Sequence, residues 1–224
     1  RPKCMVDVRG KPLLHRLVGS FNDAGVRELT VVTGYKADTV NFPGINTAEN
    51  TDFETTGEVA SLACSMDALQ GECVVSYGDI MFRSHVLNQL LDCEADIAVV
   101  VDANWKQERA ETTKRTVDLA ACSHAYTGDY FDDEVSELTR LDSAMNEADA
   151  NGEWIGLAKF SANGSELLRA ELDNMKSDGS LAKASMNDLF NRLIDSGAKP
   201  QVVYITGNWL DVNDAFDLAR ARNF

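Results

Sequence analysis

Short apolar, β-branched runs alternate with stretches of helical periodicity through the first half of the chain. The helical stretch 12–24 places Leu14, Leu17 and Phe21 on one face. Apolar strands joined by amphipathic helices require crossover connections. The pattern therefore predicts an α/β fold with a mainly parallel, mixed sheet and helices on both faces. The expected strands are 29–33, 72–77 and 97–101, and the expected helices are 12–24, 57–69 and 84–93.

The second half of the chain contains shorter elements of both kinds. Strands are expected at 116–121, 134–140, 154–160 and 201–205, and helices at 165–175, 187–196 and 214–222, the last with Asp214 as its N-cap. No repeat, linker or low-complexity tract divides the 224 residues. We therefore expect one domain that spans 1–224.

The charge balance excludes several classes of partner. Lys and Arg total 21 against 36 Asp and Glu, and the formal net charge is −15. Such a surface repels nucleic acid, although a metal ion or a local basic cluster can still attract a small anion. No apolar run approaches the roughly 20 residues that span a membrane, and no signal peptide opens the chain. A cytoplasmic protein without membrane or nucleic-acid partners is expected.

The cysteines and histidines do not indicate a disulfide framework or a zinc site. The five cysteines are an odd set without a CxxC pair, and they are interpreted as reduced, buried thiols: Cys4, Cys64, Cys73, Cys93 and Cys122. The three histidines are scattered, without the spacing of metal ligands: His15, His85 and His124.

Two acids lie in the segments that follow predicted strands. Asp79 ends the run Tyr-Gly-Asp after strand 72–77, and Asp211 follows strand 201–205. Ligands of open parallel sheets bind at the carboxyl ends of the strands. Two carboxylates from separate loops can hold one Mg²⁺ and leave positions for water and phosphates. Asp79 could instead cap the next helix, but the pair together fits an enzyme that handles nucleotides.

The opening segment is the best candidate for a phosphate contact. Lys3 supplies a point positive charge after a rigid Pro2, and Arg1 and Arg9 add to the local potential. An ordinary solvated basic segment is the alternative interpretation.

Four motifs, in this order and spacing, resemble the nucleotidyltransferase superfamily over nearly the whole chain. They are Pro-Lys at 2–3, Val-Val-Thr-Gly-Tyr at 31–35, Tyr-Gly-Asp at 77–79 and Trp-Leu-Asp-Val-Asn at 209–213. The resemblance implies a Rossmann-like fold of the nucleotide-diphospho-sugar transferase type. It implies that Lys3 contacts phosphates and that Asp79 and Asp211 bind Mg²⁺, these three forming the catalytic set.

One departure from the family concerns the glycine-rich phosphate loop. The family begins with a strand and an Ala-Ala-Gly-x-Gly-x-Arg loop before the Pro-Lys motif, and the backbone N–H groups of such a loop wrap a triphosphate. The chain begins after this segment. We expect the native protein to extend upstream, and the resemblance also allows a longer or fused protein.

The segment 55–62 resembles the base- and ribose-facing stretch of choline-phosphate and phosphonate cytidylyltransferases. This resemblance favours CTP and implies nucleotide contacts at Thr56, Gly57, Glu58, Ser61 and Gly78. The same segment also fits the start of a helix, with a threonine cap and Glu58 in the first turn. The two interpretations are compatible.

The acceptor is predicted from charge and from further resemblance. The stretches 99–107, 115–119 and 152–161 look most like the phosphonate cytidylyltransferase branch, which implies 2-aminoethylphosphonate or a hydroxylated phosphonate. A zwitterion needs aromatic faces or carboxylates beside its cationic nitrogen. The candidates for this contact are Asp102, Trp105, Glu153 and Trp154. Such tryptophans belong to the core more often than to a ligand cage, but Trp105 stands among polar residues, where a purely structural Trp is less expected.

Several alternatives stay open at this point. Phosphocholine or a sugar 1-phosphate could be the acceptor, and a non-catalytic nucleotide-binding module is a further alternative. The resemblance also allows fusion to, or association with, another phosphonate-pathway enzyme, and a homo-oligomer. Mg²⁺ is the one cofactor expected.

Overall fold

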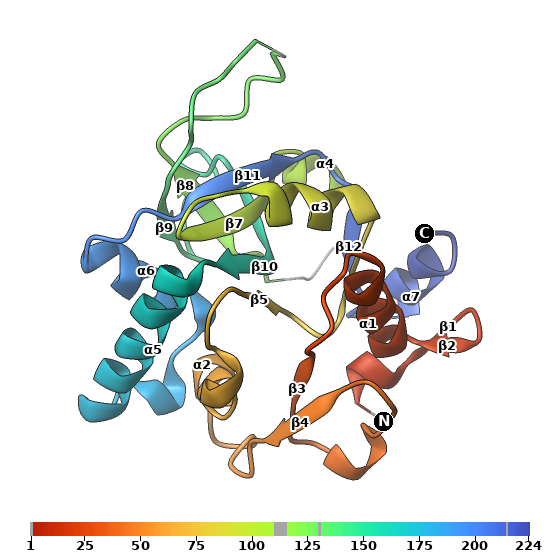
Figure 1. The fold of residues 1–224 in the computed structure, drawn as a ribbon. Coiled ribbons are helices and arrows are strands. Elements are labelled where there is room, and N and C mark those ends of the chain that lie inside the picture. The colour runs from red at the N-terminus through yellow and green to blue at the C-terminus, as the bar shows by residue number, and fades with distance from the viewer. Residues whose placement is uncertain (1, 110–115, 130, 214) are drawn as a thin grey trace.

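The computed structural model describes residues 2–109, 116–129, 131–213 and 215–224. Among these residues, the central sheet has six strands, and its longest path runs β11–β7–β10–β8–β9 (Figure 1). β5 pairs with the same edge of β10 as β8 does, but at the opposite end of that strand. The six strands are β5 (Cys73–Ser76), β7 (Ile97–Asp102), β8 (Leu119–Cys122), β9 (Leu138–Leu141), β10 (Gly152–Phe160) and β11 (Gln201–Ile205).

The predicted fold class, a mixed α/β sheet flanked by helices, is confirmed. β5, β7 and β11 run in one direction, and the β7–β11 ladder is parallel. β5 and β7 do not pair directly, because β10 lies between them and runs antiparallel to both. An apolar run predicts a buried strand but carries no information about its direction, so the parallel pairing is more limited than the sequence suggested.

Both faces of the sheet are covered because alternate side chains of β7 enter different cores. Val99 and Val101 belong to the core under α2, α5 and α6, whereas Ala98 and Val100 belong to the core under α1 and α3. All six residues of β7 are buried, as expected for a strand between two helical layers. These helices are α1 (Leu13–Asp23), α2 (Glu58–Ala63), α3 (Ser84–Asp92), α5 (Ala162–Ser177) and α6 (Met186–Asp195).

The remaining elements are short, and the sequence pattern missed most of their strands. β3 (Thr30–Thr33) pairs in parallel with β4 (Asn46–Glu49), and β6 (Ile80–Phe82) pairs antiparallel with β12 (Trp209–Asp211). The hairpin β1–β2, α4 and α7 complete the described elements: β1 (Asp7–Val8), β2 (Lys11–Pro12), α4 (Trp105–Arg109) and α7 (Ala215–Ala221). The predicted N-cap Asp214 and the motif residue Arg115 lie outside the described residues.

Three predicted elements are markedly shorter in the structure, and the helix expected over 165–175 is longer, since α5 runs from Ala162 to Ser177. The helix expected over 57–69 ends at Ala63 and is followed by a 3₁₀ turn, Met66–Ala68. The strand expected over 134–140 is formed only at its end, by β9. The strand expected over 116–121 begins at Leu119.

β5 and β3 are among the strands that keep one edge without a partner within the described residues. β5 pairs only with β10, and β3 pairs only with β4. Val74 and Val75 in β5 are half-buried, whereas every residue of β7 is buried. An unpaired edge of this kind is where another strand can add to a sheet.

The cysteines are free thiols, and four of the five are half-buried. Cys64 is exposed, because it follows α2 on the surface, so its predicted burial is wrong. Burial raises the pKa of Cys122 to about 11. Within the described part of the chain, no helix is long and apolar enough to cross a membrane.

Asp102 joins the end of β7 to the segment before β12. It is fully buried, and its Oδ1 accepts hydrogen bonds from the backbone N–H groups of Asn104 and Gly207, each at 2.9 Å. Its Oδ2 accepts from Trp209 Nε1 at 2.8 Å. A buried carboxylate with three donors is satisfied, and its removal would leave those donors without partners.

The substitution Asp102→Ala is therefore expected to lower the free energy of unfolding by about 3 kcal/mol, because buried N–H donors lose their acceptor. Urea denaturation measures this difference. The matched control Asp67→Ala removes an exposed carboxylate and should change stability by less than about 0.5 kcal/mol. Equal stability of the two variants would contradict the anchoring role of Asp102.

Candidate active site

A cavity of about 870 Å³ opens where β5, β6, β10 and β12 meet, and we call it the acidic cavity. Five carboxylates line it, and Lys3 is the single lysine or arginine among its lining residues, all of which the structure describes. The carboxylates are Glu58, Asp79, Asp118, Glu153 and Asp211. Its volume is typical of small-ligand sites.

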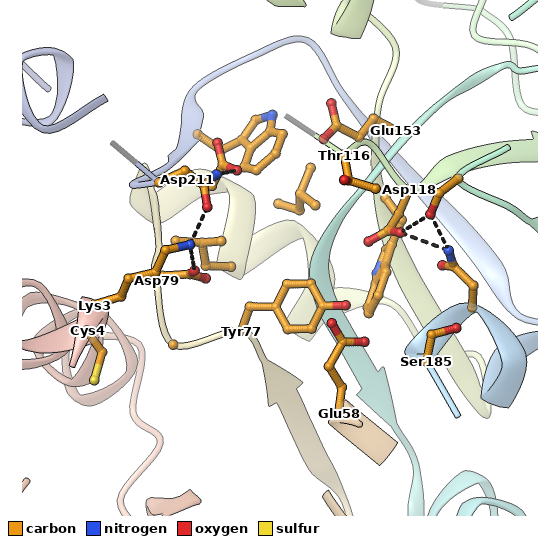
Figure 2. Close-up of a pocket in the computed structure, with 18 residues that line it drawn as sticks. Lys3, Cys4, Glu58, Tyr77, Asp79, Thr116, Asp118, Glu153, Ser185 and Asp211 are labelled. Carbon is orange, nitrogen blue, oxygen red and sulfur yellow. Dashed lines mark hydrogen bonds and ion pairs between the residues drawn. The ribbon is translucent and has the colours of Figure 1, made fainter. Parts of the chain in front are cut away.

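One wall of the acidic cavity is a chain of hydrogen bonds centred on Lys3. Lys3 Nζ lies 3.3 Å from Asp79 Oδ2 and also donates to Asn213 Oδ1. Asn213 Nδ2 in turn donates to Asp211 Oδ2 (Figure 2). The three residues predicted to be catalytic are thereby brought to one wall, with Asn213 linking two of them.

Backbone pairing determines how close Asp79 and Asp211 are. Asp211 is the register partner of Ile80, the residue after Asp79, and Val212 N donates to Asp79 O at 2.9 Å. Two hard carboxylate oxygens suit Mg²⁺, which usually keeps several water ligands. The donor set therefore fits a Mg²⁺ ion held by two side chains. The described residues contain no group of three or more His, Cys, Asp or Glu side chains placed to hold a metal.

Tyr77 forms the floor between this wall and the opposite one (Figure 2). Its ring packs on Gly156, which has φ of +80°, and a Cβ at that position would lie 2.2 Å from Tyr77 Cδ2. Burial raises the pKa of Tyr77 well above its usual range, and the nearby carboxylates of Asp118, Glu58 and Asp79 raise it further. The phenol is therefore neutral at physiological pH and offers an O–H group, not a charge.

The opposite wall carries Asp118, which two neighbours hold in place. Asn187 Nδ2 donates to Asp118 Oδ1 at 2.8 Å, and Ser143 Oγ donates to the same oxygen at 3.0 Å. Glu153 lies on this side as well (Figure 2). The cavity is therefore divided into a wall with one cation and two acids, and a wall with acids alone.

The predicted nucleotide contacts divide into two groups. Glu58 and Gly78 line the acidic cavity. Thr56 and Ser61 do not line it, because their hydroxyls accept hydrogen bonds from buried Asn50 Nδ2 at 2.9 and 3.0 Å. Gly57 also lies outside the lining set.

Gly57 and Glu58 are attached to the segment before α6. Gly57 N donates to Ala182 O at 2.8 Å, and a Cβ on Gly57 would lie 2.5 Å from Ala184 O. Glu58 Oε2 accepts from Met186 N at 3.2 Å. The close approach of the two backbones explains why glycine occupies this position.

The predicted acceptor contacts also divide. Glu153 and Trp154 line the acidic cavity, and Trp154 packs against Tyr77 with ring centroids 5.3 Å apart. Asp102 and Trp105 do not line it. Asp102 is bound by the donors described above, and Trp105 is 2% exposed in a small core with Val117 and Leu119. A direct acceptor contact does not fit these two positions.

The sequence interpretation missed several lining side chains. Tyr77 and Asn213 belong to motifs that carry the resemblance, so their positions were available as a signal. Asp118 also lies in such a stretch, 115–119, but nothing in the sequence joined it to Asn187, because the two side chains meet only when α6 packs beside β9.

A family model described as the MobA-like NTP transferase domain matches residues 1–180. The chain belongs to this family. It is therefore a nucleotidyltransferase, an enzyme whose class of reaction is transfer of a nucleotidyl group from a nucleoside triphosphate.

Two curated relatives of this nucleotidyltransferase have specific names. The Campylobacter jejuni protein named CTP:phosphoglutamine cytidylyltransferase is 25% identical over 97% of this chain and 90% of the relative. The Lancefieldella rimae protein named 2-aminoethylphosphonate cytidylyltransferase is 26% identical over 72% of this chain, and the match spans 59% of that relative.

Solved structures share the fold at low identity. The CTP:phosphocholine cytidylyltransferase of Streptococcus pneumoniae has a TM-score of 0.71 at 15% identity, covering 99% of this chain and 89% of that chain. The inositol-1-phosphate CTP transferase of T. maritima has a TM-score of 0.72 at 14% identity, covering 99% and 88%. These similarities establish the nucleotidyltransferase fold.

Proposed function

We propose that the nucleotidyltransferase is a Mg²⁺-dependent cytidylyltransferase that condenses CTP with a small zwitterionic phosphonate, with 2-aminoethylphosphonate as the first candidate. The observation that carries the acceptor proposal is the division of the acidic cavity into a Lys3–Asp79–Asp211 wall and an acidic wall with Asp118 and Glu153. A zwitterion fits between these walls with its phosphonate toward the first and its ammonium toward the second. The names of both curated relatives support CTP.

In the proposed reaction, a phosphonate oxygen attacks the α-phosphorus of CTP. The new O–P bond forms as the bond from the α-phosphorus to the bridging oxygen breaks, and pyrophosphate leaves. The acceptor is already ionised, so the reaction needs no general base. The protein must align two anions and offset their repulsion.

The residues of the first wall have distinct proposed roles. Lys3 is 53% exposed in its side chain and can exchange its bond to Asp79 for a phosphate oxygen. Asp79 and Asp211 would hold Mg²⁺, which supplies positive charge to the reacting phosphates when bound. Asn213 holds the side chains of Asp211 and Lys3 in place through a hydrogen bond to each. Glu58 and Gly78 are proposed nucleotide contacts, and Glu153 and Trp154 proposed acceptor contacts.

The substitution Asp211→Asn in full-length protein is expected to lower kcat by about 100-fold or more, or about 3 kcal/mol, because one metal-binding charge is lost. CTP-dependent pyrophosphate release measures the change. Asp67→Asn is the matched control and should keep wild-type turnover. Turnover of Asp211→Asn within a few-fold of wild type would refute the metal-binding role, and absence of any pyrophosphate release by wild-type protein would favour the non-catalytic alternative.

Acceptor selectivity tests the acidic wall. 2-Aminoethylphosphonate and ethylphosphonate differ in the ammonium group, so the ratio of their kcat/KM values isolates the contact to that charge. Wild-type protein should favour 2-aminoethylphosphonate, and Asp118→Asn should reduce this preference about tenfold, since one partly desolvated charge pair is lost. Asp142→Asn, an acid outside the cavity lining, is the control and should leave the ratio unchanged.

The same assay with other acceptors separates the rival substrates. A phosphoglutamine-type acceptor is the second candidate, because the relative of that name aligns with 97% of this chain. Phosphocholine retains the cationic nitrogen, whereas glucose 1-phosphate lacks it. A preference for glucose 1-phosphate, or for UTP over CTP, would contradict the proposal.

We also propose that an upstream strand and phosphate loop complete the sheet between β5 and β3 in full-length protein. The support is the edge that each of these strands leaves unpaired among the described residues. The β5 amides that do not bond to β10 should exchange hydrogen at least about tenfold more slowly in full-length protein than in residues 1–224, because a new ladder protects them. Equal exchange rates would contradict this.

Cytoplasmic location, fusion to another enzyme and a homo-oligomer remain predictions.

A further inference from the structure

A second cavity, of about 430 Å³, is lined by residues of α1, the β1–β2 hairpin, the end of β6 and the C-terminal segment with α7, and we call it the basic cavity. Figure 1 shows α1, this hairpin and α7 near one another. Asp23 is the single acid among its lining residues, all of which the structure describes. The chain has 36 acids against 21 Lys and Arg, so this gathering of basic side chains runs against the overall charge. The basic residues are Arg9, Lys11, His15, Arg16 and Arg83.

The cations of the basic cavity are not neutralised by the protein. None of its three arginines, nor Lys11, forms an ion pair with a carboxylate among the described residues. Elsewhere on the chain, cations such as Arg192 and Lys199 have acidic partners. Uncompensated cations around one hollow produce a positive potential that attracts an anion.

Arg16 is held in a fixed orientation in this cavity. Its Nε donates to Val8 O at 2.7 Å, and its Nη2 donates to Arg9 O at 3.1 Å. These bonds use two of the five donors of the guanidinium, so others remain for a ligand. A guanidinium positioned in advance loses less entropy when it binds a phosphate in a bidentate manner.

The β1–β2 turn presents Arg9 at a conformational cost. Arg9 has φ of 52° and Gly10 has φ of 77°. Two-residue turns with positive φ at both positions favour Asn, Asp or Gly at the first of them. An arginine at this position is disfavoured locally, and such residues often have a functional reason.

One side of the basic cavity is apolar. The Arg83 guanidinium lies 4.3 Å from the centroid of the Phe224 ring, and Met81 and Phe82 also line the cavity. A purely inorganic anion would not use this surface. Cations beside an aromatic ring and an apolar side chain fit a ligand that has both a phosphate and an apolar body.

We propose that the basic cavity is a second ligand site, distinct from the acidic cavity, that binds a small organic phosphate. The phosphate contacts Arg16, Lys11 and Arg83, and the organic part lies against Phe224 and Met81. The site does not depend on which acceptor the enzyme uses. It shares β6 with the acidic cavity, since Ile80 lines one and Met81 lines the other.

Phenyl phosphate is the probe, and isothermal titration calorimetry in EDTA measures its binding to full-length protein. Without a divalent cation, the carboxylates of the acidic cavity repel a phosphate, so binding reports the basic cavity. We expect saturable binding at one site. The double variant Lys11→Gln/Arg83→Gln should weaken the affinity at least about tenfold, because two charge-assisted contacts are lost.

The control variant Arg140→Gln/Lys199→Gln removes the same charge from residues that do not line either cavity. Its affinity should stay within about twofold of wild type, as expected for exposed charges beyond the screening length. Phe224→Leu should weaken phenyl phosphate more than inorganic phosphate. Equal weakening in both double variants, or no saturable binding to wild type, would overturn the proposal. Loss of binding in Lys3→Gln alone would also overturn it, since Lys3 belongs to the acidic cavity.

Discussion

The position of both carboxylates beside Lys3 depends on the way Asp102 anchors the segment that leads into β12. Asp102 accepts from Gly207 N and from the indole of Trp209, so the end of β7 determines where β12 begins. β12 then pairs with β6, and this pairing brings Asp211 next to the residue after Asp79. The fully buried Asp102 thus controls the geometry of two half-buried acids in the cavity, because satisfied buried polar groups tolerate few alternative arrangements.

The sequence predicts that acids lie at or after the ends of apolar strands. It does not predict which of these acids line a cavity and which is buried. Asp79, Asp102 and Asp211 all follow or end apolar strands. Asp79 and Asp211 reach the acidic cavity, whereas Asp102 turns inward toward Trp209, which is 107 positions away in the chain. Local pattern cannot distinguish these outcomes, because they depend on a donor supplied by a distant segment.

Helices and buried strands could be predicted because apolar periodicity reports burial within one element. Individual lining residues could not be predicted, because periodicity does not report contacts between distant elements. The period of apolar residues reports which face of an element is buried, and α1, α3, α6 and β7 follow it closely. Asp118 and Asn187 come together through the packing of a helix on a sheet edge, which no period encodes. Trp105 illustrates the converse, since its polar neighbours in sequence suggested exposure and its neighbours in space bury it.

β6 separates two cavities of opposite charge, and this arrangement has a consequence for phosphate ligands. Ile80 is among the lining residues of the cavity with five carboxylates and one lysine, and Met81 is among those of the cavity with five basic residues. A phosphate therefore meets a repulsive potential on one side and an attractive one on the other until a divalent cation binds beside Asp79 and Asp211. With the two proposed sites, Mg²⁺ not only promotes transfer but also determines which of the two cavities binds a phosphate more tightly. When no metal ion is bound, the acidic cavity therefore repels free phosphates, and the net charge of −15 adds to this repulsion.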